Sequence, residues 1–139
     1  MPTPPDDVAL NKAGIIERCI RRIQEEYAAD PTLSNVTHTD ALTLNIERAC
    51  QAAIDLAMHL VAEGRLGMPK NSAEAFTLMR KAGIIPQELE THLRAMTGFR
   101  NVAIHEYRDL DKSILHVIAR DGWKDLIQFC KHLGLKIEP

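Results

Sequence analysis

The chain has 139 residues, of which 45% are hydrophobic and only 4% aromatic, and its formal net charge is −2. This length accommodates one domain with a single hydrophobic core, and the near-neutral charge excludes a wholly basic protein that coats RNA. Any contact with RNA must therefore come from a local cluster of basic side chains. The mainly aliphatic composition favours packed helices over strands.

The three cysteines, Cys19, Cys50 and Cys130, are widely spaced and form no C-x2-C pair, which predicts buried thiols rather than disulfides or a zinc site. The N-terminus lacks the basic and apolar regions of a secretory signal, and no apolar run approaches the ~20 residues that span a bilayer. We expect a cytoplasmic protein without membrane contact or cofactor. Residues 1–139 form one domain, and residues 1–7 are expected to be a flexible segment.

The first predicted helix runs from about Val8 to Ala28, because Ile16, Ile20 and Ile23 recur at helical spacing on one face. Asp30-Pro31 ends it, since the residue before a proline disfavours the helical conformation.

A second helix is predicted from Asp40, a good N-cap, to Glu63, just before Gly64. Its apolar residues form a broad stripe that we expect to be buried: Leu42, Ile46, Ala49, Ala53, Leu56 and Leu60. The polar residues Arg48, Asp55 and His59 share a different face of this helix.

The glycines and proline of residues 64–72 predict a loop. Asn71 and Glu74 resemble a capping box that opens a short helix through Ala82, which Gly83 then stops. Pro86 suits the first position of the next helix, where its missing N–H is harmless.

Asp111 is predicted to cap a last helix that bends at Gly122. Its inward-facing residues are expected to be Leu115, Ile118, Leu126, Phe129 and Leu133. The predicted fold class is therefore all-α: a single-domain antiparallel bundle of four long helices and one short helix, with up-and-down connections.

The fourth helix, over residues 89–107, carries an unusual stripe. Its members recur at steps of three and four in a core-facing register: Leu89, Leu93, Met96, Arg100, Ala103 and Tyr107. Because arginine is rarely buried without a partner, Arg100 is expected either to pair with a carboxylate or to face a shared cleft. A second stripe is polar and consists of Arg94, Gly98, Asn101 and His105.

Helical geometry restricts how Arg100 and His105 can act together. At about 100° per residue, the two side chains point ~140° apart on a straight helix, whereas Arg100 and Tyr107 nearly align. Two explanations remain open. The helix frays or bends between Arg100 and His105, or a second copy of the protein supplies the missing partner across a two-fold axis, which predicts a homodimer.

Cleavage of an RNA phosphodiester suits these residues. His105 can take a proton from a ribose 2′-hydroxyl or give one to the leaving 5′-oxygen. Arg100 offers a planar fork of donors to the phosphate oxygens, and Asn101 can orient the imidazole or the phosphate. The sequence contains no cluster of carboxylates typical of a two-metal site, so we expect a metal-independent route through a cyclic phosphate.

Two further groups of residues can support such a site. Asp55, His59 and Arg48 can orient His105 or extend the phosphate site, although a solvated or hydrogen-bonded polar face is the more common explanation of such residues. A local basic patch can form from the arginines Arg18, Arg21, Arg22 and Arg94.

The spacing R-x4-H-x-Y, here Arg100, His105 and Tyr107 near the end of a long helix, resembles that of the HEPN superfamily, and more closely that of the HepT-type toxins. The resemblance covers nearly the whole chain. Besides the motif segment LRAMTGFRNVAIHEY, it includes RCIRRIQEEY, NIERACQAAIDLAMHL and RLGMPKNSAEAFTLM.

This resemblance implies a dimer of helical bundles whose two motifs line a central cleft and cleave RNA without a metal ion, with Arg100 and His105 essential. Asn101 occupies the polar position after the arginine. The resemblance also implies a type VII-like toxin–antitoxin pair, in which a minimal nucleotidyltransferase antitoxin forms a hetero-oligomer with the toxin. The antitoxin silences the toxin by transferring AMP to the motif tyrosine, here Tyr107, where added bulk and negative charge obstruct an RNA phosphate.

Two other hypotheses use the same residues. In the first, the chain is a non-catalytic HEPN module that binds nucleotide or RNA and assembles with the nucleotidyltransferase, with Arg100 as a phosphate clamp. In the second, it is a plain structural bundle in which Arg100 is paired in the core. The second hypothesis predicts that loss of Arg100 destabilises folding by several kcal/mol.

Overall fold

A computed structural model describes residues 4–106 and 110–139. Within these residues every regular element is helical, which confirms the all-α prediction of four long helices and one short one. The elements are α1 (Asp7–Ala29), α2 (Val36–Glu63), the short α3 (Ser72–Lys81), α4 (Gln87–His105), and a last helix built from α5 (Lys112–Val117), the π-helical η2 (Ile118–Gly122) and α6 (Trp123–His132).

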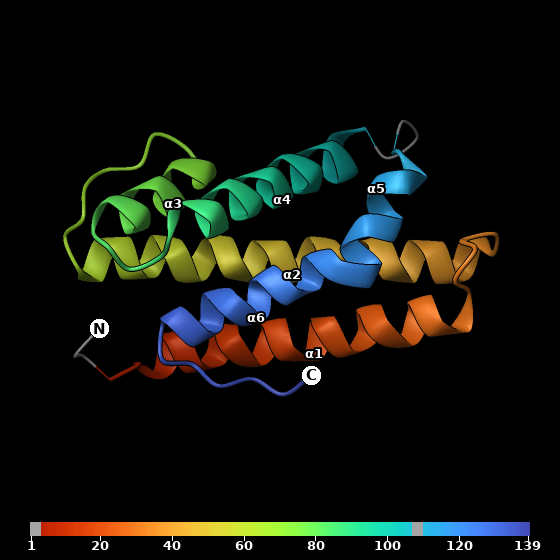
Figure 1. Cartoon of the computed structure of the whole chain (residues 1–139), viewed down its shortest axis with the longest axis horizontal. Coiled ribbons are helices and arrows are strands. Elements are labelled where there is room, and N and C mark those ends of the chain that lie inside the picture. Colours follow the sequence, from red (N-terminus) through yellow and green to blue (C-terminus); the bar gives the residue numbers. More distant parts are fainter. Residues whose placement is uncertain (1–3, 107–109) are drawn as a thin grey trace.

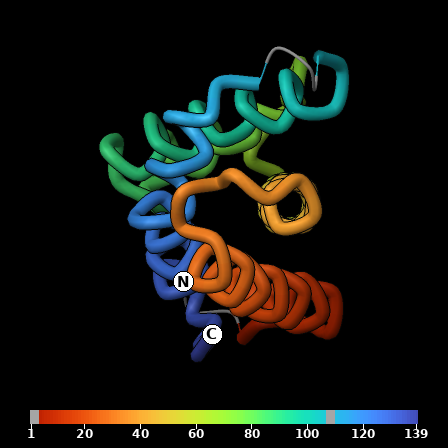
Figure 2. The backbone as a smooth tube through the Cα atoms, turned by 90° about the vertical axis from the view of Figure 1, so that its right-hand side faces the viewer, coloured from red at the N-terminus to blue at the C-terminus, as the bar shows by residue number. Residues whose placement is uncertain are grey.

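The long helices run in alternating directions, with α2 between α1 and α4 (Figure 1). The last helix crosses the bundle diagonally, and the end-on view places it to one side of α2 (Figure 2). The opposite side of α2 carries its exposed stripe, which includes Leu44, Arg48 and Met58.

Polar contacts fix the register of α1 against α2. Three of them join an acidic side chain to a basic one across this interface: Asp6 to His59 at 2.6 Å, Lys12 to Asp55 at 3.3 Å, and Glu26 to His38 at 2.6 Å. The two helices are thus held together along most of their length.

The core lies where α1, α2, α4 and the last helix meet. The residues predicted to point inward from the last helix are all buried: Leu115, Ile118, Leu126, Phe129 and Leu133. Phe129 meets Phe76 of α3 edge-to-face, with the ring centroids 5.5 Å apart. This contact attaches the short helix to the bundle, because such aromatic pairs contribute beyond their buried area.

Two helix starts differ from prediction. α2 begins at Val36, one turn before Asp40, because the Asn35 side chain accepts a hydrogen bond from the His38 N–H at 3.2 Å. Pro86 is the N-cap of α4 rather than its first residue. The predicted cap of the last helix is confirmed, since Asp111 accepts from the Ser113 N–H at 2.8 Å.

The predicted capping box is half formed. The Asn71 side chain accepts from the Glu74 N–H at 2.9 Å, whereas the Glu74 carboxylate accepts from Lys70, at 3.4 Å, instead of returning to Asn71. Gly83 follows α3 with a φ of 77°, a left-handed conformation that favours glycine.

The first helix is capped by Asp6, inside the predicted flexible segment. Residues 1–3 of the predicted flexible segment 1–7 lie outside the described residues, but Asp6 already accepts from the Ala9 N–H at 2.9 Å and caps α1. The three cysteines are free and buried, as predicted. Within residues 4–106 and 110–139, no helix is both long and apolar enough to cross a membrane.

Candidate active site

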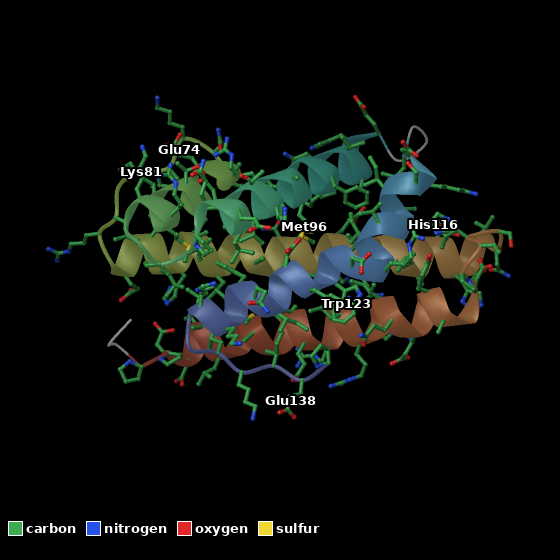
Figure 3. The ribbon with its side chains drawn as sticks, in the orientation of Figure 1. Glu74, Lys81, Met96, His116, Trp123 and Glu138 are labelled. Atoms are coloured by element: carbon green, nitrogen blue, oxygen red, sulfur yellow. The ribbon has the colours of Figure 1, made fainter. Side chains whose placement is uncertain are left out.

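The predicted core-facing stripe of α4 is confirmed as far as Ala103. Leu93, Met96 and Ala103 are buried, and Met96 lies between α4 and the last helix (Figure 3). Arg100 lies in the same stripe but is only half-buried. Its stem packs in the bundle and its Nε is buried, whereas its Nη1 makes a hydrogen bond at the surface.

Arg100 is held by a neighbour on its own helix. Its Nη1 donates to the Oδ1 of Asn101 at 2.9 Å. Among the described residues no carboxylate lies within ion-pair distance of Arg100, so the first of the two alternatives, pairing with a carboxylate, is not formed there. The amide oxygen of Asn101 serves as its acceptor instead.

The charge of Arg100 acts on the adjoining turn of α2. Burial raises the pKa of the half-buried Glu47 carboxyl, and the positive charges of Arg100 and Arg48 oppose that rise. Burial likewise raises the pKa of the Cys50 thiol to about 12, again against the charge of Arg100. The guanidinium therefore lies beside the turn of α2 that carries Glu47 and Cys50.

His105 is the exposed last residue of α4. The Glu106 N–H still donates to the Val102 carbonyl at 2.7 Å, so the helix does not fray between Arg100 and His105. The angular separation expected for a regular helix therefore applies to these two side chains. Asn101 is also exposed, on the same side of α4 as His105.

Tyr107, the predicted modification site, lies outside the described residues.

The three predicted polar residues of α2 lie in two places: two contact the start of α1, and one lies near Arg100. Asp55 accepts from Lys12 at 3.3 Å and from Gln51 at 2.8 Å, and His59 contacts Asp6. Both Asp55 and His59 thus join α2 to the N-terminal half of α1, and the structure does not bring either one to His105. Arg48 is exposed and, together with Arg100, acts on Glu47, so it alone of the three lies near the candidate site.

The predicted basic patch is only partly available. Arg22 is paired with Glu25 at 2.8 Å and Glu26 at 2.5 Å, and Arg94 donates to Thr77 at 2.6 Å. The ion pairs of Arg22 lie within α1, and the hydrogen bond of Arg94 joins α4 to α3. Arg18 and Arg21 are exposed on α1.

Sequence reasoning missed Gln51. Its Nε2 donates to Asp55, but its Oε1 is buried without a hydrogen-bond partner, as is the Nε of Arg100. The available signal was its position four residues before Asp55 on the polar stripe of α2.

A cavity of about 430 Å³ lies between α4 and the last helix, lined mainly by apolar side chains such as Met96, Phe99 and Ile118. It includes none of the predicted site residues. In the described part of the chain, no group of three or more His, Cys, Asp or Glu side chains is placed to hold a metal ion.

A five-helix bundle that carries an arginine, an amide and a histidine near the end of its fourth helix is the arrangement that the resemblance to the HEPN superfamily implies. The family model described as "Ribonuclease HepT-like" matches residues 16–133. The chain belongs to this HepT-like family.

Two curated relatives carry the same family name. The mRNA nuclease HepT of Shewanella oneidensis is 36% identical over 125 residues, which cover 89% of this chain and 94% of the relative. The tRNA nuclease HepT of Aphanizomenon flos-aquae is 30% identical over 87 residues, covering 63% of this chain and 59% of that protein.

Solved structures share the fold. The tri-AMPylated HEPN toxin of Shewanella oneidensis, in complex with its MNT antitoxin, superposes with a TM-score of 0.88 at 35% identity, covering 94% of this chain and 98% of that one. A toxin–antitoxin structure with AMP-PNP also gives a TM-score of 0.88, at 34% identity, covering 93% of this chain and 98% of that chain.

Proposed function

We propose that this protein is a toxin endoribonuclease that cleaves RNA without a metal ion and is silenced when a nucleotidyltransferase antitoxin transfers AMP to Tyr107. The observation that carries the proposal is the intact R-x4-H-x-Y motif at the end of α4, with Arg100 half-exposed and Asn101 and His105 exposed. The nuclease names of the relatives and the AMP-modified toxin–antitoxin complex support it.

The cleavage step needs one base, one acid and a charge stabiliser. A ribose 2′-oxygen attacks the adjacent phosphorus while His105 takes the 2′-hydroxyl proton. The bond from phosphorus to the 5′-oxygen breaks, and the 5′-oxygen receives a proton from an acid, which leaves a 2′,3′-cyclic phosphate and a 5′-hydroxyl. The guanidinium of Arg100 stabilises the charge that grows on the non-bridging oxygens.

Asn101 and Arg48 complete the site. Asn101 holds the Arg100 guanidinium through its Oδ1, and its amide N–H groups remain to contact the phosphate. Arg48 is exposed and has no ion pair with any described residue, and its charge acts on Glu47 together with that of Arg100. It provides a second contact for the RNA backbone.

A second protomer supplies the missing geometry. Because α4 is regular through His105, Arg100 and His105 of one chain diverge by ~140°. A two-fold homodimer that brings two α4 ends together places the arginine of one chain beside the histidine of the other.

Regulation by AMP follows from the position of Tyr107 in the sequence. In the sequence it lies two residues after His105 and seven after Arg100. An AMP group there places a phosphate next to the arginine that must bind the RNA phosphate, so the two anions compete for one cation.

Cleavage by purified, unmodified protein tests the enzymatic assignment. We expect RNA cleavage in the presence of a chelator, a cyclic phosphate at the product end, and loss of at least about 100-fold in rate in Arg100→Ala and in His105→Ala. His132→Ala, at an exposed position on α6, is the matched control and should cleave normally. Normal cleavage by both motif variants would refute the assignment.

Binding separates the enzyme from a non-catalytic HEPN module. If His105→Ala binds RNA as the parent does but no longer inhibits growth or cleaves, His105 acts in chemistry. If parent and variant bind equally and neither cleaves, the chain is a binding partner of the nucleotidyltransferase.

Intact mass spectrometry tests the regulation. Protein purified with an active antitoxin should gain whole AMP units, and Tyr107→Phe should gain none and stay toxic. If the parent protein has the same mass whether it is purified with or without the antitoxin, the proposed AMP transfer is contradicted, and the proposed ribonuclease activity is not.

A further inference from the structure

Two buried polar atoms lack a hydrogen-bond partner in the described part of the chain: the Oε1 of Gln51 and the Nε of Arg100. Buried polar groups are nearly always hydrogen-bonded, so each exception requires an explanation. One atom is an acceptor and the other a donor, which makes them chemically complementary.

A hydrogen bond to Asp55 fixes the orientation of the Gln51 amide. Its Nε2 donates to Oδ1 of Asp55 at 2.8 Å, and the other oxygen of Asp55 accepts from Lys12 at 3.3 Å. Because a carboxylate only accepts hydrogen bonds, the amide cannot turn over without losing this contact. The carbonyl oxygen of Gln51 is therefore held away from Asp55, toward the protein interior.

Arg100 lies beside the same turn of α2. Its charge acts on Glu47, one turn before Gln51, and on Cys50, the residue directly before Gln51. α2 and α4 pack against each other. The Nε of Arg100 is the buried nitrogen of that guanidinium, so an unpartnered donor on α4 and an unpartnered acceptor on α2 both lie near this turn of α2.

We propose that Gln51 is a positioning residue for Arg100: its carbonyl oxygen accepts the Nε–H of Arg100 when the guanidinium engages an RNA phosphate. The inference rests on the proposed function, since it gives Arg100 a substrate. Asp55 and Lys12 then act through Gln51 by fixing its amide.

The consequence is directional. A guanidinium whose Nε–H is bound on the inner side presents both Nη groups outward as a fork, the arrangement that binds two phosphate oxygens at once. Without that hydrogen bond the arginine side chain samples other rotamers, and it loses more conformational entropy when it binds a phosphate. Residues that orient metal ligands in a comparable way alter activity by about 10- to 100-fold, and we expect an effect of similar size here.

The test is the Gln51→Leu variant, which removes the acceptor and keeps the volume. We expect kcat for RNA cleavage to fall about 10-fold or more with a smaller change in KM, because that hydrogen bond matters most when charge develops on the phosphate. Gln128→Leu, exposed on α6, is the matched control and should retain the parent kcat. Thermal melting of both variants checks that the fold is intact.

A double-mutant cycle tests the pairing itself. Lysine has no Nε–H fork, so in the Arg100→Lys background Gln51→Leu should cause no further loss of kcat, or of affinity for an uncleavable 2′-O-methyl RNA. Combining Gln51→Glu with Asp55→Asn keeps both an acceptor at position 51 and a hydrogen bond between the two positions. We expect this pair to recover much of the activity that Gln51→Leu loses.

Two outcomes overturn the inference while leaving the proposed function standing: a folded Gln51→Leu variant with the parent kcat, or additive losses in the Arg100→Lys cycle. If Gln51→Leu does not fold, Gln51→Met is measured by the same criteria. The proposed function fails separately, when the parent protein itself does not cleave RNA.

Discussion

The environment of Arg100 separates a functional arginine from a structural one. It is half-buried, it bonds only to Asn101 among the described residues, and it has no carboxylate within ion-pair distance there. A buried and paired arginine would instead leave an uncompensated charge behind when removed.

The stability of Arg100→Ala should therefore stay close to that of the parent. We expect a loss of less than about 1 kcal/mol in urea unfolding, mainly from the packing of the stem. Leu93→Ala, in the same stripe but 1% exposed, should cost about 2–5 kcal/mol in the same assay. A loss of about 3–5 kcal/mol for Arg100→Ala would favour the structural bundle over the ribonuclease.

Arg48 should contribute to RNA affinity through charge alone. Arg48→Gln is expected to weaken binding of a 2′-O-methyl RNA severalfold and to reduce the slope of log affinity against log salt by about 1. Arg22→Gln makes the same charge change at an arginine already paired with Glu25 and Glu26, and it should leave the slope unchanged. Equal slopes for parent and Arg48→Gln would remove Arg48 from the site.

The sequence located the motif residues but not their contacts. Helical periodicity correctly placed Arg100 in the buried stripe of α4, because that stripe depends only on spacing along one helix. The nearness of Arg100 to Glu47, and the unpartnered oxygen of Gln51, depend on how α4 lies against α2. No local pattern encodes that arrangement.

At the scale of whole helices, the ends of helices were predicted best where a single residue determines the end. The end of α1 before Pro31 and the cap at Asp111 follow from local chemistry and are confirmed. The start of α2 was wrong by a turn because both Asn35 and Asp40 are good caps. The contact of Glu26 with His38 falls in the turn that only the earlier start makes helical.

Glu90 joins α3 to α4. Its carboxylate, 8% exposed, accepts from Thr77 at 2.6 Å and from Arg80 at 2.9 Å, and these hydrogen bonds, led by that from Thr77, lower the pKa of Glu90 below its ordinary value of 4.5. A lowered folded-state pKa means that the carboxylate stabilises the fold above about pH 4.5. This contribution is lost as pH falls through the folded-state pKa.

Glu90→Gln should consequently lose about 1–2 kcal/mol of stability at pH 7. The difference from the parent should shrink as pH falls below 4.5, where the parent carboxylate also becomes neutral. Thermal melts at pH 7 and at pH values below 4.5 measure this. Glu88→Gln, exposed on the same helix, is the control, and a difference from parent that stays constant with pH would contradict the linkage.

At the scale of the whole molecule, the regularity of α4 decides how the site is assembled. Since the helix continues through His105, one chain cannot easily direct Arg100 and His105 at the same phosphate. The homodimer that we propose resolves this, because it places the arginine of one protomer beside the histidine of its partner.

Mixing two inactive variants tests that assembly. In a dimer of one Arg100→Ala chain and one His105→Ala chain, a composite arrangement leaves one site with both native residues and the other with neither. Random exchange makes about half of the dimers mixed, so about a quarter of all sites and of the parent cleavage rate should return. Each variant alone should remain inactive. If the sites are instead built within single chains, the mixture stays as inactive as its components, and α4 must distort on binding RNA to bring Arg100 and His105 together.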